Sequence, residues 1–333
     1  MKSGAGQAIY AIANVDLGYS SVSQTLSSFN GTHDEFLGLT ATLRNRTNVD
    51  RGIFMMSGQL QNDYGESGVT VDTDGKFLDI ANDAVIPLNR LEARITFNIR
   101  VDQSTWKNLK FVPKYYQVEQ IPIGSYLIPR EKGTGGTNTW DYCDAGYASM
   151  SEGNQEKTDI TELDNNDEND YRFEFYVWEN RFNPNQEIEE GDAENENAEN
   201  LYALREKHEQ GDYVSNPDKP GQEYEQGAFK YAHEHSTYVV IYGELTYTNT
   251  EEKTVTANVY YTIHLGSTGS EKVNGENWFN RPTLVNNYDT KRNTHYTYTI
   301  TIAGVKSMRV EVNEEREEQR PGMESPRHKR CQP

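Results

Sequence analysis

Residues 91–101, LEARITFNIRV, alternate apolar and polar side chains without a break. A period of two places one set of side chains against a core and the other set in water. The stretch therefore predicts a strand of an antiparallel sheet that has one dry face and one wet face. The side chains expected to point inward are Leu91, Ala93, Ile95, Phe97, Ile99 and Val101.

Three other segments repeat this alternation, namely residues 171–177, 256–265 and 294–302. The second of these is preceded in the chain by a further apolar run, 236–248, and the polar residues 249–253 separate that run from residues 254–265. Two strand-like runs joined by so short a polar link predict a β-hairpin. Weaker strand signals lie at residues 8–15, 52–58, 69–71, 109–118 and 125–128.

The composition agrees with a β-rich protein. Aromatic residues make up 11% of the 333, with 22 Tyr, 11 Phe and 4 Trp, and such residues suit pleated, half-wet surfaces. Helix signals are few, at residues 21–30, 32–46 and 198–209. The sequence therefore predicts an all-β chain of antiparallel β-sandwich domains with a few short helices.

Two shifts in composition suggest how the domains divide. Residues 130–170 are rich in Gly, Thr, Asn and Asp, which predicts a boundary between domains at 1–160 and 161–315. Residues 187–199 carry seven acids and are expected to form a solvated loop of the second domain. Residues 316–333 are basic and show no strand pattern, which predicts a disordered tail.

The net charge of −20 excludes some classes of partner. Nucleic acids and anionic membrane surfaces attract Lys and Arg, so neither is expected to bind here. No stretch reaches the roughly 20 apolar residues of a transmembrane helix. Cys143 and Cys331 belong to no CxxC pair, and the sequence leaves open whether they form a disulfide.

Catalytic and metal-binding motifs are weak throughout. His233 and His235 share one face if they lie in a strand, but no third ligand is close in sequence, so we predict no metal site there. The acidic segment 164–170 alternates oxygen ligands, yet an EF-hand would require Gly at 169 and Glu at 175, which are Asn169 and Phe175. Calcium at 164–170 is kept only as an alternative. We predict no catalytic residue and no cofactor, and hence no enzyme.

Aromatic residues near glycines suggest a different kind of site. Trp140, Tyr142 and Tyr147 could stack on sugars, or they could cap the sandwich. They are the candidate ligand residues of the sequence. Carboxylates are abundant, but no pair is singled out by its spacing, which leaves a β-sandwich glycosidase as a third hypothesis.

Six segments, in order along the chain, resemble conserved elements of the fimbrillin superfamily, the subunits of Bacteroides-type (type V) fimbriae. Each one alone is a weak signal, but together they run from residue 8 to about residue 312. They are YAIANV (10–15), FMMSG (54–58), IPLNRLEARI (86–95), FYVWEN (175–180), TYVVIYG (237–243) and NNYDTKRNTHY (286–296).

The resemblance implies two transthyretin-like, Greek-key β-sandwiches in tandem, the second in a longer variant that is typical of accessory or tip subunits. It also implies export as a lipoprotein precursor, a place in a fimbrium (pilus) at the outer membrane, and polymerisation by strand donation between subunits. The expected partners are other fimbrial subunits, with host or bacterial surface glycans and proteins as ligands in cell adhesion.

The two ends depart from the family's pattern. No signal peptide or lipidation cysteine precedes the YAIANV segment, and residues 325–333 form a basic tail without a strand pattern. We therefore expect a fragment whose N-terminal domain lacks its first strands. The alternative to a fimbrial subunit is a β-sandwich carbohydrate-binding adhesin at the cell surface.

Overall fold

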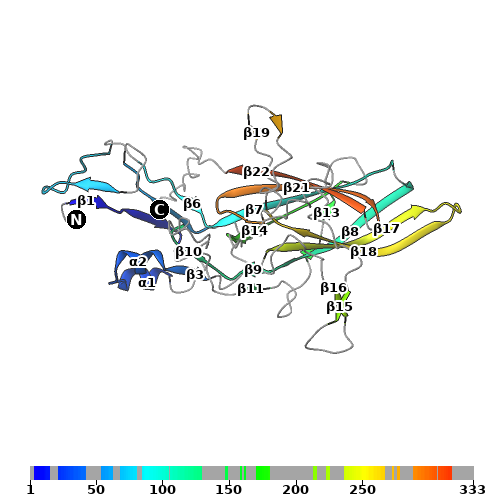
Figure 1. The fold of residues 1–333 in the computed structure, drawn as a ribbon, viewed down its shortest axis with the longest axis horizontal. Helices are drawn as coiled ribbons and strands as arrows, with labels where there is room; N and C mark the ends of the chain where they lie inside the picture. Colours follow the sequence, from blue (N-terminus) through cyan, green and yellow to red (C-terminus); the bar gives the residue numbers. More distant parts are fainter. Residues whose placement is uncertain are drawn as a thin grey trace, which may run out of the picture.

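The structure is a computed structural model, shown in Figure 1. It describes residues 4–15, 22–42, 54–62, 68–80, 85–104, 106–129, 170–180, 236–266, 288–305 and 307–316, and several short strands between these ranges. The molecule is elongated, with two larger sheets at one end and smaller sheets with two helices at the other (Figure 1).

The first large sheet has five strands in the order β13-β14-β7-β21-β22. All neighbours are antiparallel except β7 and β21, which run parallel. An entirely antiparallel sheet was predicted, and that prediction is wrong for this pair, because strands so far apart in the chain need no hairpin. The strands are β13 (Thr161–Glu162), β14 (Tyr171–Trp178), β7 (Glu92–Val101), β21 (Thr294–Gly304) and β22 (Ser307–Arg316).

The second large sheet has four antiparallel strands in the order β12-β8-β17-β18. It packs face to face on the first, and the inward side chains of both sheets form one hydrophobic core (Figure 1). We call these two layers the sandwich. The strands of this sheet are β12 (Thr158–Asp159), β8 (Lys107–Glu119), β17 (Tyr238–Thr248) and β18 (Thr254–His264).

The predicted alternation is confirmed in the central strands. In β7 the side chains of Ala93, Ile95, Phe97 and Ile99 are all at most 1% exposed. The outer face of β7 is less exposed to solvent than the alternation predicts, because Glu92 and Thr96 on that face are also buried. The predicted hairpin of residues 236–265 is confirmed as β17 and β18, with residues 249–253 as its turn.

The other end of the molecule, which we call the N-terminal region, consists of small sheets and two helices. Strand β1 pairs with β5, β3 pairs with β10, and β2, β4 and β6 form a three-stranded sheet in that order with β4 central. The elements are β1 (Gly4–Gln7), β2 (Tyr10–Ala13), α1 (Val22–Ser28), α2 (His33–Leu37), β3 (Thr40–Thr42), β4 (Met56–Gln59), β5 (Val69–Val71), β6 (Asn89–Arg90) and β10 (Gly124–Tyr126).

Three further pairs of short strands complete the described elements. They are β9 (Ile121–Pro122) with β11 (Tyr147–Ala148), β15 (Tyr213–Ser215) with β16 (Glu223–Glu225), and β19 (Lys272–Val273) with β20 (Glu276–Asn277). No helix of the described residues is long and apolar enough to cross a membrane.

The sheets do not divide at residue 160. Strands β7 and β8, which precede that position, are internal strands of the two sandwich layers and pair there with β14, β17 and β21. The segment 130–170, where the composition shifts, includes β12 and β13, which pair with β8 and β14 in the two layers, so the predicted boundary at 160 falls within the sandwich. The N-terminal region ends near β6, and among the later described strands β10 returns to it by pairing with β3.

The all-β prediction is confirmed, with α1 and α2 as the only α-helices of the described residues. Both lie within the helix signals at 21–30 and 32–46, but each is shorter than its signal. Strands β1, β3 and β22 were not predicted, and neither were the strands of two or three residues β6, β9, β11, β12, β13, β15, β16, β19 and β20. The predicted helix at 198–209, the acidic loop 187–199 and the tail after residue 316 lie outside the described residues.

Candidate functional site

The core of the N-terminal region is only half covered. Two clusters of buried side chains lie there, and the apolar side chains that pack around them remain partly exposed. Leu78 and Val85, nearby in the chain, are 65% and 79% exposed. The partly buried set is Ile9, Ile12, Val15, Leu26, Leu39, Phe77, Ile80 and Ile86, and we call it the apolar end.

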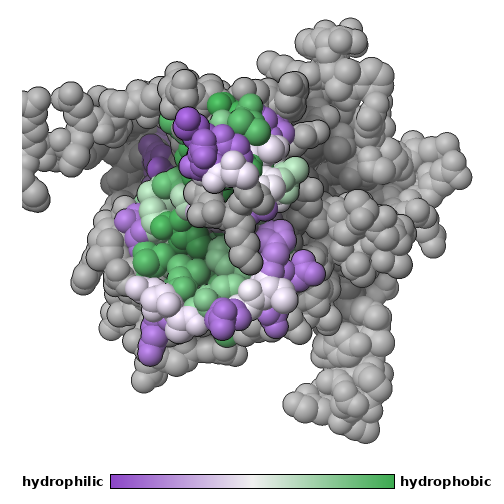
Figure 2. Space-filling model, turned by 90° about the vertical axis from the view of Figure 1, so that its left-hand side faces the viewer, coloured by the Kyte–Doolittle hydropathy of each residue, from purple (hydrophilic) through white to green (hydrophobic). Residues whose placement is uncertain are grey.

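Figure 2 looks onto this end of the molecule. Apolar side chains gather at the centre of the view, and hydrophilic side chains form a rim around them. Soluble proteins rarely expose contiguous apolar patches unless the patch binds something. The apolar end is therefore the leading candidate for an interaction site.

Strand β2 lies beside this patch and forms an edge of its sheet. It pairs with β4 on one side, and no described strand pairs with it on the other. The backbone N–H of Leu60 donates to the carbonyl oxygen of Ile9. Because hydrogen bonds alternate in an antiparallel pair, Ala11 and Ala13 also bond to β4, and the backbone groups of Tyr10 and Ile12 point to the outer edge.

All four residues of β2 are only partly buried, unlike the alternating strands of the sandwich. An edge that exposes unpaired N–H and C=O groups is a template for another strand. Among the described strands, β2 therefore presents an open edge and, on the same strand, an apolar side chain, Ile12, of the half-covered core. An added strand would form hydrogen bonds with this edge and pack its side chains against Ile12.

Two residues of the motif segments shape this edge. Asn14 ends β2 with a φ of 64° and donates from its side chain to the carbonyl of Phe54 at 2.7 Å. Left-handed backbone is tolerated by Asn better than by most residues. In β4, a Cβ on Gly58 would lie 2.0 Å from the carbonyl oxygen of Pro87, so a side chain has no room there.

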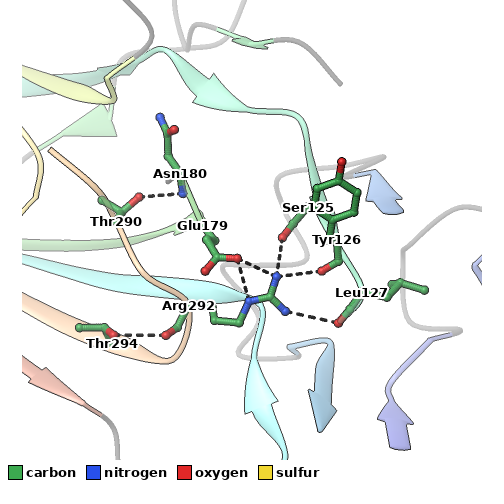
Figure 3. A network of polar contacts seen from close by, with 8 residues as sticks. All are labelled: Ser125, Tyr126, Leu127, Glu179, Asn180, Thr290, Arg292 and Thr294. Atoms are coloured by element: carbon green, nitrogen blue, oxygen red, sulfur yellow. Dashed lines mark hydrogen bonds and ion pairs between the residues drawn. The ribbon is translucent and has the colours of Figure 1, made fainter. Parts of the chain in front are cut away.

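A buried polar junction joins the N-terminal region to the sandwich (Figure 3). Arg292 Nη2 lies 2.7 Å from Glu179 Oε2, and both side chains are about nine-tenths buried, at 8% and 11% exposure. Arg292 also donates to the carbonyl oxygens of Tyr126 and Leu127, at 2.9 and 3.3 Å, and to the hydroxyl of Ser125 at 3.3 Å. A sandwich residue thereby holds the segment at β10 that pairs with β3.

The rest of the junction is made by neighbouring motif residues. Asn180 and Thr290 exchange two backbone hydrogen bonds, at 2.9 and 2.8 Å. The side-chain amide of Asn180 donates to the hydroxyl of Thr237, and that hydroxyl donates to the backbone carbonyl of Gln120. Three motif segments from distant parts of the chain thus meet here, which indicates that these residues hold the fold together.

A charged cluster on the outer face of the five-stranded sheet has the same structural character. Glu174 accepts from Arg94 at 2.8 Å and from the Thr96 hydroxyl at 3.1 Å. Partial burial raises the pKa of Glu174, but the hydrogen bond and charge of Arg94 and the Thr96 hydroxyl outweigh it, so the pKa lies below its usual value. A carboxylate held ionised by these partners suits an ion pair rather than a general acid.

The sugar-stacking residues predicted from the sequence cannot be placed together. Trp140 and Tyr142 lie outside the described residues, and Tyr147 is described only as backbone of β11. His233, His235 and residues 164–169 also lie outside them, as do both cysteines. Within the described residues, no group of three or more His, Cys, Asp or Glu is arranged to hold a metal ion. The predictions of no enzyme and no cofactor stay predictions.

No protein-family model and no curated protein matches the sequence. Among solved structures, a candidate cell adhesion protein from Parabacteroides distasonis is similar over 92% of this chain and 74% of its own, with 13% identity and a TM-score of 0.47. The tip fimbrial protein Mfa3 from Porphyromonas gingivalis is similar over 94% and 81%, with 12% identity and a TM-score of 0.45. Similarity at this level assigns no function to this chain.

Proposed function

We propose that this chain is a structural subunit of a cell-surface fimbria, and that a strand donated by a neighbouring subunit pairs with the outer edge of β2. The observation that carries the proposal is the open backbone edge at Tyr10 and Ile12 beside the half-covered apolar end. The resemblance of six sequence segments to fimbrillins supports it independently.

The donated strand would gain two kinds of stabilisation. Each backbone hydrogen bond to the edge contributes about 0.5–1.5 kcal/mol net. Apolar side chains at every second position of the donor would cover the partly exposed residues of the apolar end, at about 25 cal/mol per Å² of apolar surface removed from water. An extended segment with alternating apolar side chains is thus the expected partner.

The proposal includes a location. A fimbrial subunit of this family would be exported as a lipoprotein and assembled at the outer membrane, where it would contribute to adhesion. Fractionation of the source cells tests this: the chain should be found with surface fimbriae, and recovery from the cytosol alone would contradict it.

Strand addition is tested with synthetic ten-residue peptides that carry apolar residues at every second position. We expect at least one such peptide to raise the Tm of the chain and to form a stable complex. The matched control is the same peptide N-methylated at alternate residues. Methyl groups on the N–H groups that face β2 should abolish binding, whereas methyl groups on the other set should leave much of it.

Equal loss with either N-methylated peptide would contradict strand pairing and would indicate simple hydrophobic capture. A library in which no peptide stabilises the chain would count against the acceptor role of β2. The variant Ile12→Pro tests the same edge from the side of the chain. Proline lacks the N–H group that points to the open edge at this position, and the hydrogen bonds between β2 and β4 are kept. It should weaken peptide binding strongly and lower the Tm of the free chain only slightly.

A further inference from the structure

An exposed pair of aromatic side chains lies at the end of the sandwich that points away from the N-terminal region. Strand β7 runs from that region at Glu92 to this end at Val101, where the β7–β8, β17–β18 and β21–β22 turns come together (Figure 1). Trp106 in the first turn is 36% exposed. Its ring centroid lies 4.9 Å from that of Tyr247, near the end of β17, at an interplanar angle of 59°. We call Trp106 and Tyr247 the distal pair.

The sequence around Trp106 is that of a solvent-exposed turn. The alternation of β7 ends at Val101, and the residues that follow are polar apart from the tryptophan, DQSTWKN (102–108). The indole N–H of Trp106 makes no hydrogen bond with any residue that the structure describes, whereas a buried Trp N–H usually finds a partner. The exposed part of the ring and its N–H are therefore available to a ligand.

Hydrogen bonds fix the backbone on both sides of this tryptophan. Before it, the Asp102 carboxylate accepts from the backbone N–H of Ser104 at 2.8 Å and from the Ser104 hydroxyl at 2.6 Å. After it, Asn108 has a φ of 58°, and its side-chain amide donates to the hydroxyl of Thr248 at 3.1 Å. A ligand of Trp106 would therefore meet a turn that is already ordered, which lowers the cost of binding.

The charges at this end are balanced. The described side chains of residues 100–108, of the β17–β18 turn and of residues 303–305 include three acids and three bases, and Lys306 lies outside the described residues. One acid and one base, Glu251 and Lys253, form an ion pair at 2.8 Å. Because neither sign dominates, the site selects neither an anionic nor a cationic partner. The six residues are Arg100, Asp102, Lys107, Glu251, Glu252 and Lys253.

We propose that the distal pair is the stacking platform of a binding site for an uncharged carbohydrate. The apolar C–H face of a sugar ring would pack on Trp106, whose ring is supported by Tyr247. The sugar hydroxyls would bond to the exposed side chains of Ser104 and Asn108, on either side of Trp106 in the turn. This site goes beyond the proposed fimbrial assembly, because it lies at the opposite end of the molecule from the edge of β2.

The size of the site favours a sugar over a protein partner. A stable protein interface buries about 800 Å² on each partner, from roughly 20–30 residues, and its centre is depleted of charge. Of the large apolar side chains that are exposed in the described residues, only Trp106 and Val305 lie at this end, and charged side chains lie around them. One indole ring among hydrogen-bonding side chains matches a single sugar ring, which has an apolar face and a polar rim.

The test is binding of the full chain to an array of neutral, uronate-containing, sialylated and sulfated oligosaccharides, followed by titration calorimetry with the best neutral hit. We expect neutral glycans to bind, and Trp106→Ala to weaken the binding about ten-fold, because the stacking surface is lost. Trp106→Phe should keep more of the affinity. The matched control is Leu78→Ala, which removes a more exposed apolar side chain in the N-terminal region and should leave binding unchanged.

Two further measurements locate the sugar. Asn108→Gly keeps the left-handed backbone of this position but removes the amide, so it should weaken binding several-fold and leave the Tm almost unchanged. Binding should also change the tryptophan fluorescence of the wild-type chain, and this change should be absent from Trp106→Phe. The fluorescence result holds even if Trp106→Ala lowers the Tm, since it requires no loss of the aromatic ring.

The proposal is overturned by an array without hits, by hits confined to charged glycans, or by equal affinity of the wild-type chain and Trp106→Ala. A fluorescence change that persists in Trp106→Phe would also overturn it, because the sugar would then bind elsewhere. If no glycan binds, but the chain self-associates in sedimentation and Trp106→Ala abolishes the association, the distal pair is a contact between copies of the chain instead.

Discussion

The sandwich and the N-terminal region are built from similar strands but differ in how far each completes its core. In the sandwich, two layers enclose a single cluster of aromatic and aliphatic side chains, and Phe97, Tyr296 and Tyr298 are fully buried. In the N-terminal region the buried clusters are small, and Ile9, Ile12 and others around them stay partly exposed.

The difference shows what a strand needs for stability. Strand β7 has neighbours on both sides and an opposing sheet above it, whereas β2 has one described neighbour and a half-covered face. The strands thus enclose a finished core in the sandwich and leave a partly exposed core in the N-terminal region. The open one is where an external strand could bind.

The largest expected effect concerns the link between the two regions. Arg292→Ala leaves the Glu179 carboxylate buried without its ion-pair partner and frees three groups at residues 125–127. We expect the free energy of unfolding to fall by about 3–5 kcal/mol. Denaturant unfolding followed by tryptophan fluorescence measures this, because Trp178, next to Glu179 in the chain, is buried in a core cluster of the N-terminal region.

The control for that substitution is Lys114→Ala, which removes an exposed ion pair with Glu244. It should change stability by less than about 1 kcal/mol. Equal effects of the two substitutions would show that the junction does not hold the regions together.

A matched pair of core substitutions compares the two regions directly. Ile95 is fully buried in the sandwich, and Ile12 is partly exposed at the apolar end. Ile95→Ala should cost about 2–5 kcal/mol because it leaves a cavity, and Ile12→Ala should cost about 1 kcal/mol. Chemical denaturation of both variants checks this, and an equal loss would mean that the N-terminal core is as closed as the sandwich.

Alkaline pH should destabilise the sandwich. Burial raises the pKa of Tyr261 and Tyr296 well above the ordinary value of 10.0, because an ionised phenolate is costly inside the core. The stabilisation is complete below pH 10 and is lost as the pH rises towards the pKa of the folded state, since the unfolded chain ionises first. Unfolding followed at increasing pH by the 295 nm absorbance of tyrosinate should therefore be cooperative above about pH 10. Gradual ionisation of these residues without unfolding would contradict their burial.

The smallest effect is expected at helix α2. Thr32 caps this helix in a capping box with Glu35, whose side chain accepts from the Thr32 backbone N–H at 2.7 Å. Thr32→Ala should cost about 1 kcal/mol. If Tm and peptide binding both stay unchanged, the helix contributes nothing to the half-covered core. Thr256→Ala, on an exposed face of the sandwich, is the control.

Most strands of the sandwich could be predicted from the sequence, because apolar and polar residues alternate without a break in its central strands. Strand β22 was missed although Met308, Val310 and Val312 alternate with polar residues, since its apolar side chains are few and its polar ones strongly charged. The parallel pairing of β7 with β21 left no sequence signal. The register between strands whose paired residues, such as Arg94 and His295, are just over 200 positions apart depends on the whole fold.

The candidate sites were harder to predict from the sequence, because they also depend on contacts between distant parts of the chain. Glu179 and Arg292 stand out only as parts of two motifs, and nothing local shows that they pair over 113 positions. Likewise, the stacked rings of Tyr115 and Tyr242, with centroids 4.7 Å apart, come together only once β8 and β17 are in register. By contrast, the aromatic residues that were close in sequence, Trp140 and Tyr142, lie outside the described residues.

Residue-resolved hydrogen exchange with and without a stabilising peptide tests the central claim most directly. In the free chain, the amides of Tyr10 and Ile12 should exchange fast while those of Ala11 and Ala13, bonded to β4, are slower. On adding the peptide, Tyr10 and Ile12 should become protected, and β7 and β21 should stay unchanged. Slow exchange of Tyr10 and Ile12 in the free chain, or no protection by the peptide, would contradict an open edge that accepts a strand.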